Sequence, residues 1–400
     1  MLARMRHDHT ARDEPRWQAL RRLFPIFERA HYVAACSQGP LCRPVEDAIA
    51  RFMDTWRLEG NAWETEWMPT VARTADKFAR LVGAPPASVG VNASVSAAMG
   101  AILSAIDFRH RPRVIVSALD FPTLPDILLA YRRKGSIELV VLPQQAGEIP
   151  IELYERAVDE QTALVCISSA SYATGVQFPI KAVAELCRAR GALCLIDAFQ
   201  SVGALAVDVG QLRPDFLITG TLKYLLGCMG VALIYVAPGL AERLEPHSIG
   251  WMAAANPFGT SFDDLEYAPG AARFQAGTFS IPGCYAAEAA LDLLLEIGAP
   301  AIEARVLRLS RRFADGLSDL CIRPAGPTEV GKLGPMVAVP VHGDSHEWQE
   351  RLRHEESVIA AARGSSLRFA FHVYNDDDDV DACLEVVRRR LSPGAMRTRS

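Results

Sequence analysis

One lysine, Lys223, lies in a stretch that is otherwise small, apolar or hydroxyl-bearing, "ITGTLKYLLGCMG" (218–230). Removing an ammonium group from water without a partner is costly, so this lysine is either at the surface, with its stem along apolar groups, or takes part in chemistry. A partly desolvated lysine beside hydroxyls, here Thr219 and Thr221, is the arrangement expected of an amine that forms a Schiff base.

Two other segments place polar residues where an apolar element ends. "LCLIDAFQSVG" (193–203) ends a strand with Asp197, and Gln200 follows three positions later. A carboxylate there needs a partner: a protonated ring nitrogen would serve, and capping of the next turn is the alternative. In "SVGVNASVSAAMGAILSAI" (88–106), a strand leads through Ser94 into an apolar helix. The start of that helix is either a phosphate site or an ordinary serine cap.

The order of these features is more specific than any one of them. Pyridoxal 5'-phosphate requires an anion site for its phosphate, a partner for its pyridinium nitrogen and an amine for a Schiff base. The chain supplies groups of these three kinds in succession, at Ser94, at Asp197 with Gln200, and at Lys223. We therefore expect pyridoxal 5'-phosphate as the cofactor.

The elements that position these residues are short apolar runs separated by helical segments. Several runs are apolar almost throughout, which is typical of strands covered on both faces of a mainly parallel sheet. The last two are joined by too few residues for a crossover helix, so we expect them to pair antiparallel. The pattern predicts an α/β fold. The runs are "RVIVSAL" (113–119), "ELVVLP" (138–143), "TALVCISSA" (162–170), "ALCLIDA" (192–198), "DFLITG" (215–220) and "VALIYV" (231–236).

The pattern changes after residue 284, where two long helical segments precede a final strand-to-helix unit. We expect a large cofactor-binding domain over 39–283 and a smaller α+β domain over 284–400. Residues 1–38 are expected to form an arm that packs on the small domain.

Composition narrows the class of protein. With 400 residues, 50% hydrophobic and 22% charged, and a net charge of -5, the chain has a globular composition and no broad cationic surface for nucleic acid. No run of about 18 apolar residues occurs, and the start of the sequence lacks a signal-peptide core, so we expect no membrane partner and a cytoplasmic location. The nine cysteines form no C-x-x-C pair and the nine histidines no H-E-x-x-H motif, so no metal site is expected.

The longest motif is "LCLIDAFQSVGALAVDVGQLRPDFLITGTLKYLLGCMGVALIYV" (193–236). It resembles the cofactor core of the class V aminotransferase superfamily of fold type I pyridoxal-phosphate enzymes. That group includes cysteine desulfurases, selenocysteine lyases, kynureninases and isopenicillin N epimerase-like proteins. The resemblance extends from about residue 32 to 390. It implies a large domain with a mainly parallel sheet and a smaller carboxyl-terminal α+β domain.

The resemblance implies roles for the residues around the cofactor ring. Lys223 would form the Schiff base and move the Cα proton, Asp197 would pair with the pyridine nitrogen, and Gln200 would contact the phenolic oxygen. Phe121, in "SALDFPTLPD", takes the place of the aromatic residue that stacks on the ring. Tyr172, in "SYATG", falls near the cofactor face.

The phosphate and the second subunit are implied in the same way. Ser94, Val95, Thr219 and Thr221 are the expected phosphate contacts within one chain. "ARFQAGTFSIPG" (272–283) is similar to a family loop whose Gly277 and Thr278 reach the phosphate of the neighbouring subunit. The resemblance therefore implies a homodimer with shared active sites.

Near the carboxyl terminus, "LRFAFHVYNDDDDVDACLEVV" resembles the closing motif of the family, in which Arg368 binds the substrate carboxylate. A planar bidentate donor suits that group. The run of four aspartates raises a metal site as an alternative. We instead expect a helix with Asn375 as its N-cap, acids in its first turn and arginines in its last.

The resemblance implies an enzyme that acts on an α-amino acid, through a Schiff base with the cofactor and a carbanion at Cα. The stretch "HEESVIAAARGSSLR" lacks the nucleophilic cysteine of desulfurases, and its Arg363 stands where kynureninase-like proteins often have arginine. We favour cleavage at Cβ by a C–S lyase with a cysteine-type or S-conjugated substrate. A class V aminotransferase is the alternative, followed by a kynureninase-like hydrolase, an epimerase or a non-catalytic binding protein of this fold.

Overall fold

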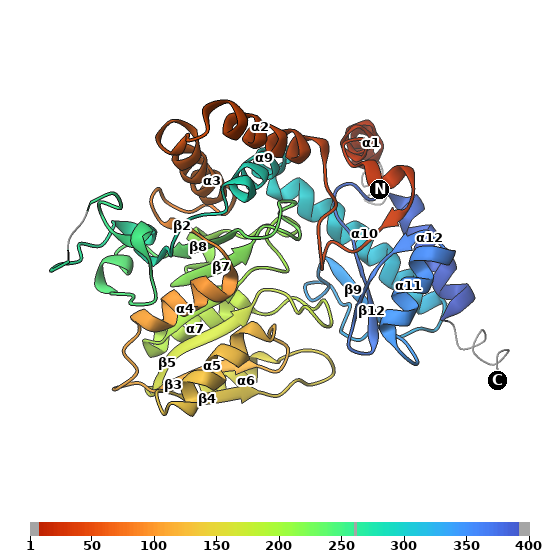
Figure 1. Ribbon diagram of the computed structural model, residues 1–400. Helices are drawn as coiled ribbons and strands as arrows, with labels where there is room; N and C mark the ends of the chain where they lie inside the picture. The colour runs from red at the N-terminus through yellow and green to blue at the C-terminus, as the bar shows by residue number, and fades with distance from the viewer. Residues whose placement is uncertain (1–7, 260–261, 392–400) are drawn as a thin grey trace.

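The computed structural model describes residues 8–259 and 262–391. Within them, the main sheet has the strand order β2-β8-β7-β6-β5-β3-β4. Figure 1 shows this sheet beside a second, smaller sheet formed by the carboxyl-terminal part of the chain. The strands of the main sheet are β2 (Val89–Asn92), β3 (Arg113–Ser117), β4 (Glu138–Leu142), β5 (Thr162–Ser168), β6 (Leu193–Asp197), β7 (Phe216–Gly220) and β8 (Ala232–Val236).

The pairing of these strands confirms the predicted sheet. Strands β4, β3, β5, β6 and β7 run parallel to one another. Strand β8 pairs antiparallel with β7 and with β2, as the short connection between the last two apolar runs predicted. The carboxyl ends of the parallel strands therefore meet along one edge, where open α/β sheets bind ligands.

Helices cover both faces of this sheet, which explains why its strands are apolar throughout. Ile115 of β3 packs into one core, and its neighbours Val114 and Val116 pack into the other. One face is covered by α4 (Val95–Ala105) and α5 (Thr123–Arg133). The other is covered by α2 (Arg43–Glu59), α3 (Met68–Leu81), α7 (Ile180–Arg190) and α9 (Ile281–Ile297).

The smaller sheet has the order β11-β12-β9 and is antiparallel. Its core includes Phe313 and Phe369, whose ring centroids lie 4.8 Å apart. The elements here are α10 (Ala299–Asp319), β9 (Met336–Pro340), α11 (Ser345–Glu355), β10 (Val358–Ile359), β11 (Ala361–Arg363), β12 (Ser366–Ala370) and α12 (Asp377–Arg390). The domain limits 1–38, 39–283 and 284–400 stay a prediction, and residues 1–7 and 392–400 lie outside the described residues.

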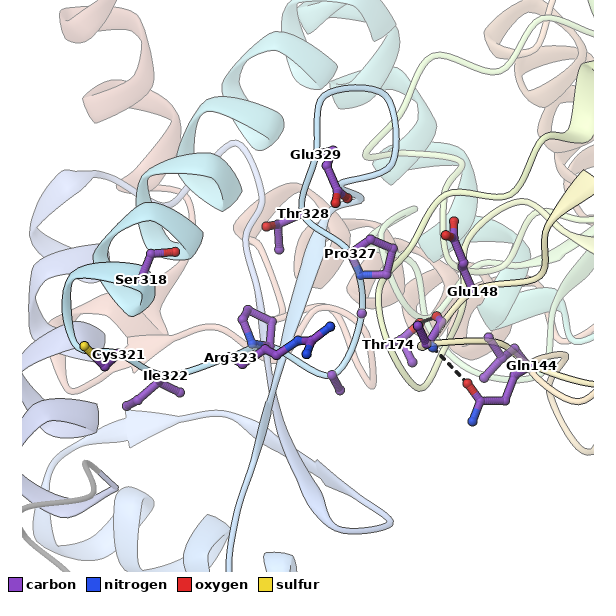
Figure 2. A pocket seen from close by; sticks show the side chains of 16 residues that line it. Gln144, Glu148, Thr174, Ser318, Cys321, Ile322, Arg323, Pro327, Thr328 and Glu329 are labelled. Carbon is purple, nitrogen blue, oxygen red and sulfur yellow. Dashed lines mark hydrogen bonds between the residues drawn. The ribbon is translucent and has the colours of Figure 1, made fainter.

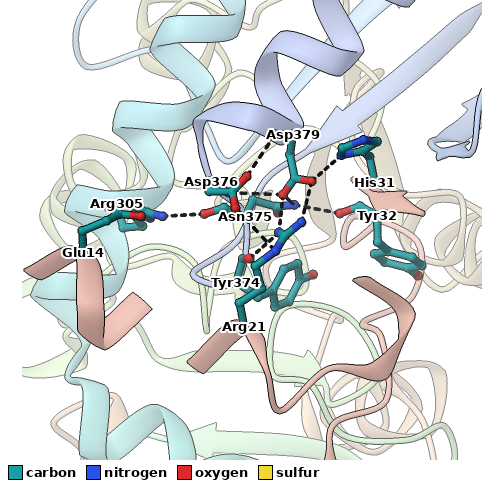
Figure 3. A network of polar contacts seen from close by, with 9 residues as sticks. All are labelled: Glu14, Arg21, His31, Tyr32, Arg305, Tyr374, Asn375, Asp376 and Asp379. Atoms are coloured by element: carbon teal, nitrogen blue, oxygen red, sulfur yellow. Dashed lines mark hydrogen bonds and ion pairs between the residues drawn. The ribbon is translucent and has the colours of Figure 1, made fainter. Parts of the chain in front are cut away.

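The end of α1 (Asp8–Arg21) and the segment that follows it are tied to α12 by a polar network around buried Asp379 (Figure 3). The Asp379 side chain is fully buried; one oxygen lies 2.6 Å from Arg21 Nη1 and the other 2.7 Å from His31 Nδ1. Strand β1 (His31–Tyr32) also pairs in parallel with β10. The hydrogen bond to Asp379 raises the pKa of His31, and Asp379 is itself held ionised by these partners, which help to lower its pKa although burial opposes them.

The predicted N-cap of the last helix is wrong. Asp376, not Asn375, caps α12: its side chain accepts from the Asp379 N–H, and Asp379 accepts from the Asp376 N–H in a capping box. Asn375 is fully buried one residue earlier, where its amide donates to the carbonyl of Tyr32 and to Asp379. Its side-chain oxygen, the atom that an N-cap would use, accepts instead from the His372 N–H at 2.9 Å and is therefore not available to the first turn of α12.

An Asp379→Asn variant should be less stable by about 3 kcal/mol, because it removes the fully buried partner of Arg21 and of His31 and leaves Arg21 only its longer contact with Asp376, at 3.4 Å. The raised pKa of His31 means that its ion pair contributes fully below its ordinary value of 6.5 and is lost as pH rises through the raised value. The loss should therefore be larger at about pH 5.5 than at about pH 8.5. Denaturant unfolding at both pH values measures it.

Asp378→Asn is the matched control, since Asp378 is exposed and lies one position earlier in the same helix turn. It should cost less than about 1 kcal/mol. Equal losses for the two variants would show that only the helix dipole, and not the network, is at work.

Candidate active site

The carboxyl ends of β3, β5, β6 and β7 bring the main sequence-predicted residues together. Phe121, Tyr172, Asp197, Gln200 and Lys223 line a single pocket that encloses about 240 Å³ of empty space. The other residues that line it are Ser168, Ala170 and Phe199. Sequence reasoning missed Phe199, since the aromatic ring between Asp197 and Gln200 carries no signal of its own in "DAFQ".

The backbone around Lys223 is held by two close approaches. The Gly39 N–H donates to the Leu222 carbonyl at 2.7 Å, and a Cβ at position 39 would lie 2.5 Å from the carbonyl oxygen of Lys223. A Cβ at Gly203, where φ is +95°, would lie 2.2 Å from the carbonyl oxygen of Tyr224. Only glycine fits at either position. The close contacts of these glycines therefore fix the position of the backbone on both sides of Lys223.

His372, which sequence reasoning also missed, holds the same loop from the small sheet. Its Nε2 lies 2.9 Å from the Tyr224 carbonyl oxygen and its Nδ1 accepts from the Val373 N–H at 2.8 Å. Burial lowers the pKa of His372 to about 4, so the ring is neutral and Nε2 is the donor. The ring also stacks between Tyr224 and Tyr374. The available signal was its place two residues before the "YN" of the closing motif.

The Lys223 amine lies among aromatic rings. Its Nζ is 4.3 Å from the Phe199 ring centroid and 5.4 Å from that of Phe121. Burial lowers the pKa of Lys223 from 10.5 to about 8; Asp197 opposes this shift, whereas the charges of Arg368 and Arg363 add to it. About a tenth of the amine is therefore neutral, and hence nucleophilic, at pH 7.

Asp197 is a buried carboxylate without a cation at ion-pair distance among the described residues. Its Oδ1 accepts from the Phe199 N–H at 3.0 Å. Burial raises the pKa of Asp197 to about 6, while that hydrogen bond and the charge of Lys223 lower it. A protonated ring nitrogen would supply the missing cation and keep Asp197 ionised.

The two aromatic residues on the rim are positioned by polar contacts. Buried Asp120 accepts from the N–H groups of Ser117 and Ser168, at 2.7 and 2.8 Å, and so fixes the turn that carries Phe121. Phe121 and Tyr172 meet edge to face with centroids 5.2 Å apart.

Arg368 approaches the same rim from β12. It is only 6% exposed, and its Nη1 donates to the Tyr172 carbonyl at 3.0 Å. Its buried Nε has no partner among the described residues. A buried guanidinium with an unused N–H next to the lysine is a ready site for an anionic group of a ligand.

The remaining predicted contacts lie outside this pocket. Ser94 is the N-cap of α4, where its hydroxyl accepts from the Ala97 N–H, and Val95 is the first residue of that helix. Thr219 and Thr221 are buried on β7 and just after it, and their hydroxyls donate to backbone carbonyls. Gly277 and Thr278 stand between the described elements η5 (Gly270–Phe274) and α9.

A wider pocket, with about 1700 Å³ of empty space against the 240 Å³ around Lys223, opens elsewhere, between the loop after β4 and the connection from α10 to β9 (Figure 2). Its charged lining includes Glu148, Arg323 and Glu329, and Glu148 is paired with Lys332. It contains no lysine or histidine among the residues that line it. Of these two pockets, only the smaller one, around Lys223, offers an amine that could form a Schiff base.

The residues of this pocket fit two parts of pyridoxal phosphate, its ring nitrogen and its aldehyde carbon. Asp197 suits the pyridinium nitrogen, and the Lys223 amine suits the aldehyde carbon. The aromatic walls suit the ring. For the phosphate, the first turn of α4 offers N–H groups, while the Thr221 hydroxyl donates to the Cys228 carbonyl and would have to turn to reach an anion.

Comparison with known proteins identifies the family. Residues 40–383 match the family model Aminotransferase class-V. An uncharacterized aminotransferase of Bacillus subtilis, YcbU, is 32% identical over 367 residues, covering 92% of this chain and 96% of the relative. The isopenicillin N epimerase of Streptomyces clavuligerus is 27% identical over 366 residues, covering 86% and 91%.

Solved structures confirm the predicted fold. The apo structure of a cysteine desulfurase from Thermococcus onnurineus NA1 superposes with a TM-score of 0.83 at 21% identity, covering 94% of this chain and 97% of that one. At this identity the likeness establishes the architecture.

The lowered pKa of Lys223 can be measured by trace acetylation of the protein without cofactor. Acetylation of Lys223 should rise to half its maximum near pH 8, because only the neutral amine reacts. An Asp197→Asn variant should lower this midpoint further, since it removes the charge that opposes the shift. Mass spectrometry of the lysine peptides gives the profile, with exposed Lys134 as reference. A Lys223 midpoint near 10.5 would contradict the desolvated site.

Proposed function

The chain belongs to the class V aminotransferase family of enzymes, and from this premise we propose that it is a pyridoxal-phosphate-dependent enzyme acting on an α-amino acid. One observation carries the proposal: the same pocket contains a desolvated lysine, Lys223, and a buried carboxylate without a cation at ion-pair distance among the described residues, Asp197. We further propose a homodimer in which Gly277 and Thr278 reach the phosphate site of the other subunit.

We assign separate roles in the reaction to several residues of the pocket. When bound, pyridoxal phosphate supplies a Schiff-base carbon and a protonated ring that accepts the electrons released at Cα. Asp197 keeps that ring nitrogen protonated. Lys223, whose pKa is about 8, takes the proton from Cα and returns it. Phe121, Phe199 and Tyr172 exclude water around the amine.

Arg368 binds the substrate carboxylate. Its Nη1 is committed to the Tyr172 carbonyl, which holds the guanidinium plane against the rim, and its Nε remains free to donate. Because the site is nearly closed, a carboxylate that reaches Arg368 stands next to the lysine amine.

For the fate of the substrate we propose cleavage at Cβ, with a cysteine-type or S-conjugated amino acid as substrate. The stretch 354–368 contains no cysteine, and none of the residues that line the pocket is a cysteine. The sulfur group would therefore leave directly into solution, and no persulfide would form on the enzyme.

Transamination is the second candidate. It is favoured by the relative named as an aminotransferase, which is 32% identical over 92% of this chain. Lys223 would then deliver the proton to the cofactor instead of back to Cα, and the amino group would pass by way of the bound cofactor to an acceptor keto acid.

A Lys223→Ala variant should bind the cofactor without a reducible Schiff base and lose turnover by about a thousandfold or more. Borohydride treatment of the wild-type protein should attach the cofactor to the peptide that contains Lys223, as seen by mass spectrometry. Lys181→Ala, on α7 and outside the pocket, is the matched control and should retain both properties. Wild-type turnover in Lys223→Ala would refute the assigned role.

Product analysis separates the two candidates. With S-methylcysteine and no keto acid, a C–S lyase should release methanethiol, pyruvate and ammonia in equal amounts. An aminotransferase should instead require an added keto acid and convert it to a new amino acid. Turnover that depends on the keto acid, with no thiol released, would sink the lyase proposal and support the second candidate.

A further inference from the structure

Two arginines project from one hairpin toward the active site. Strands β11 and β12 pair antiparallel, with Ala361 opposite Arg368 and Arg363 opposite Ser366. Arg363 is two residues from Ala361, so its side chain leaves the same face of the hairpin as that of Arg368. The two are diagonal neighbours across the strands, a spacing within reach of long side chains.

Arg363 lies at the mouth of the pocket. Its Cζ is 5.5 Å from the ring centroid of Phe121 and 5.2 Å from that of Tyr172, and the residue is exposed. These rings line the pocket of Lys223, whose Nζ lies 5.4 Å from the same Phe121 centroid. Stacking on aromatic faces orients the guanidinium plane and leaves its edge N–H groups available.

The mouth of the Lys223 pocket carries an excess of positive charge. Lys223, Arg363 and Arg368 are cationic groups close enough for both arginines to lower the pKa of the lysine. In the part of the chain that the structure describes, neither guanidinium is paired with a carboxylate, and Asp197 is assigned to the ring nitrogen. One substrate carboxylate satisfies Arg368 and leaves Arg363 unpaired.

We propose that Arg363 binds a second anionic group, so that the preferred substrate is an α-amino acid whose side chain ends in a carboxylate or a comparable anion. The proposal rests on the proposed function and narrows its substrate class: among S-conjugated cysteines, it selects those whose conjugate is acidic. Arg368 holds the α-carboxylate, and Arg363, on the same hairpin face, holds the end of the side chain.

Matched pairs of acid and amide test this selectivity. Three pairs differ only by a carboxylate and its amide: S-carboxymethylcysteine and S-carbamoylmethylcysteine, aspartate and asparagine, glutamate and glutamine. In at least one pair, kcat/KM should favour the acid by about tenfold, the gain expected of a partly exposed charge-assisted contact. Arg363→Gln should abolish this preference by slowing the acid, with little effect on the amide. Arg363→Lys should retain part of it.

Arg132→Gln on the exposed face of α5 removes a positive charge away from the pocket and should leave the ratio unchanged. A readout independent of turnover is the calorimetric affinity of the holoenzyme for succinate and for its monoamide, succinamate. Wild type should prefer succinate, and Arg363→Gln should not.

The outcomes separate this inference from the proposed function. If borohydride fails to attach the cofactor to Lys223, or no amino acid reacts, the proposed function fails. If both members of every pair react equally, or Arg363→Gln slows them equally, the enzyme proposal stands and the role of Arg363 is overturned.

Discussion

The structure around the active site depends on one constraint: an amine has been removed from water in a pocket that offers it no counter-charge at ion-pair distance among the described residues. Aromatic rings surround Lys223, and two arginines face it. Such a place is unfavourable for an ammonium group, and burial accordingly brings the pKa of Lys223 to about 8. The same surroundings would suit a lysine whose amine is bonded to a cofactor, because it would then no longer be a free ammonium group.

Holding the lysine there requires support from three separate parts of the chain. Gly39 and Gly203 pack against the backbone on either side of it, and neutral His372 donates to the next carbonyl. Each contact is short, and none tolerates a bulkier or charged substitute without movement. Holding Lys223 in this unfavourable environment therefore costs part of the free energy that stabilises the fold, a cost often found at functional sites.

The sequence predicts the parts of this arrangement that depend on local pattern. Buried strands read as apolar runs because both faces of the sheet are covered, and Asp197 and Lys223 are visible because a charge interrupts such a run. Contacts between segments that are far apart in the chain produce no such local pattern in the sequence. Asn375 has the residue type of an N-cap, yet its side-chain oxygen accepts from the His372 N–H instead of from the helix. Its amide donates to the Tyr32 carbonyl and to Asp379. His372 and Phe199 have ordinary neighbours, and only the tertiary structure places them beside the lysine.

The segment 31–39 shows why the two sheets form one site. Val33 accepts from the Ala370 N–H at the end of β12, the strand that carries Arg368. Three residues later the Cys36 carbonyl accepts from Gln200, and Gly39 donates to the residue before Lys223. One short segment therefore contacts the strand of Arg368, the loop that carries Gln200 and the backbone just before Lys223. The contact of His31 with Asp379 ties the start of this segment to α12, so the last helix and the backbone before Lys223 are held by the same stretch of chain.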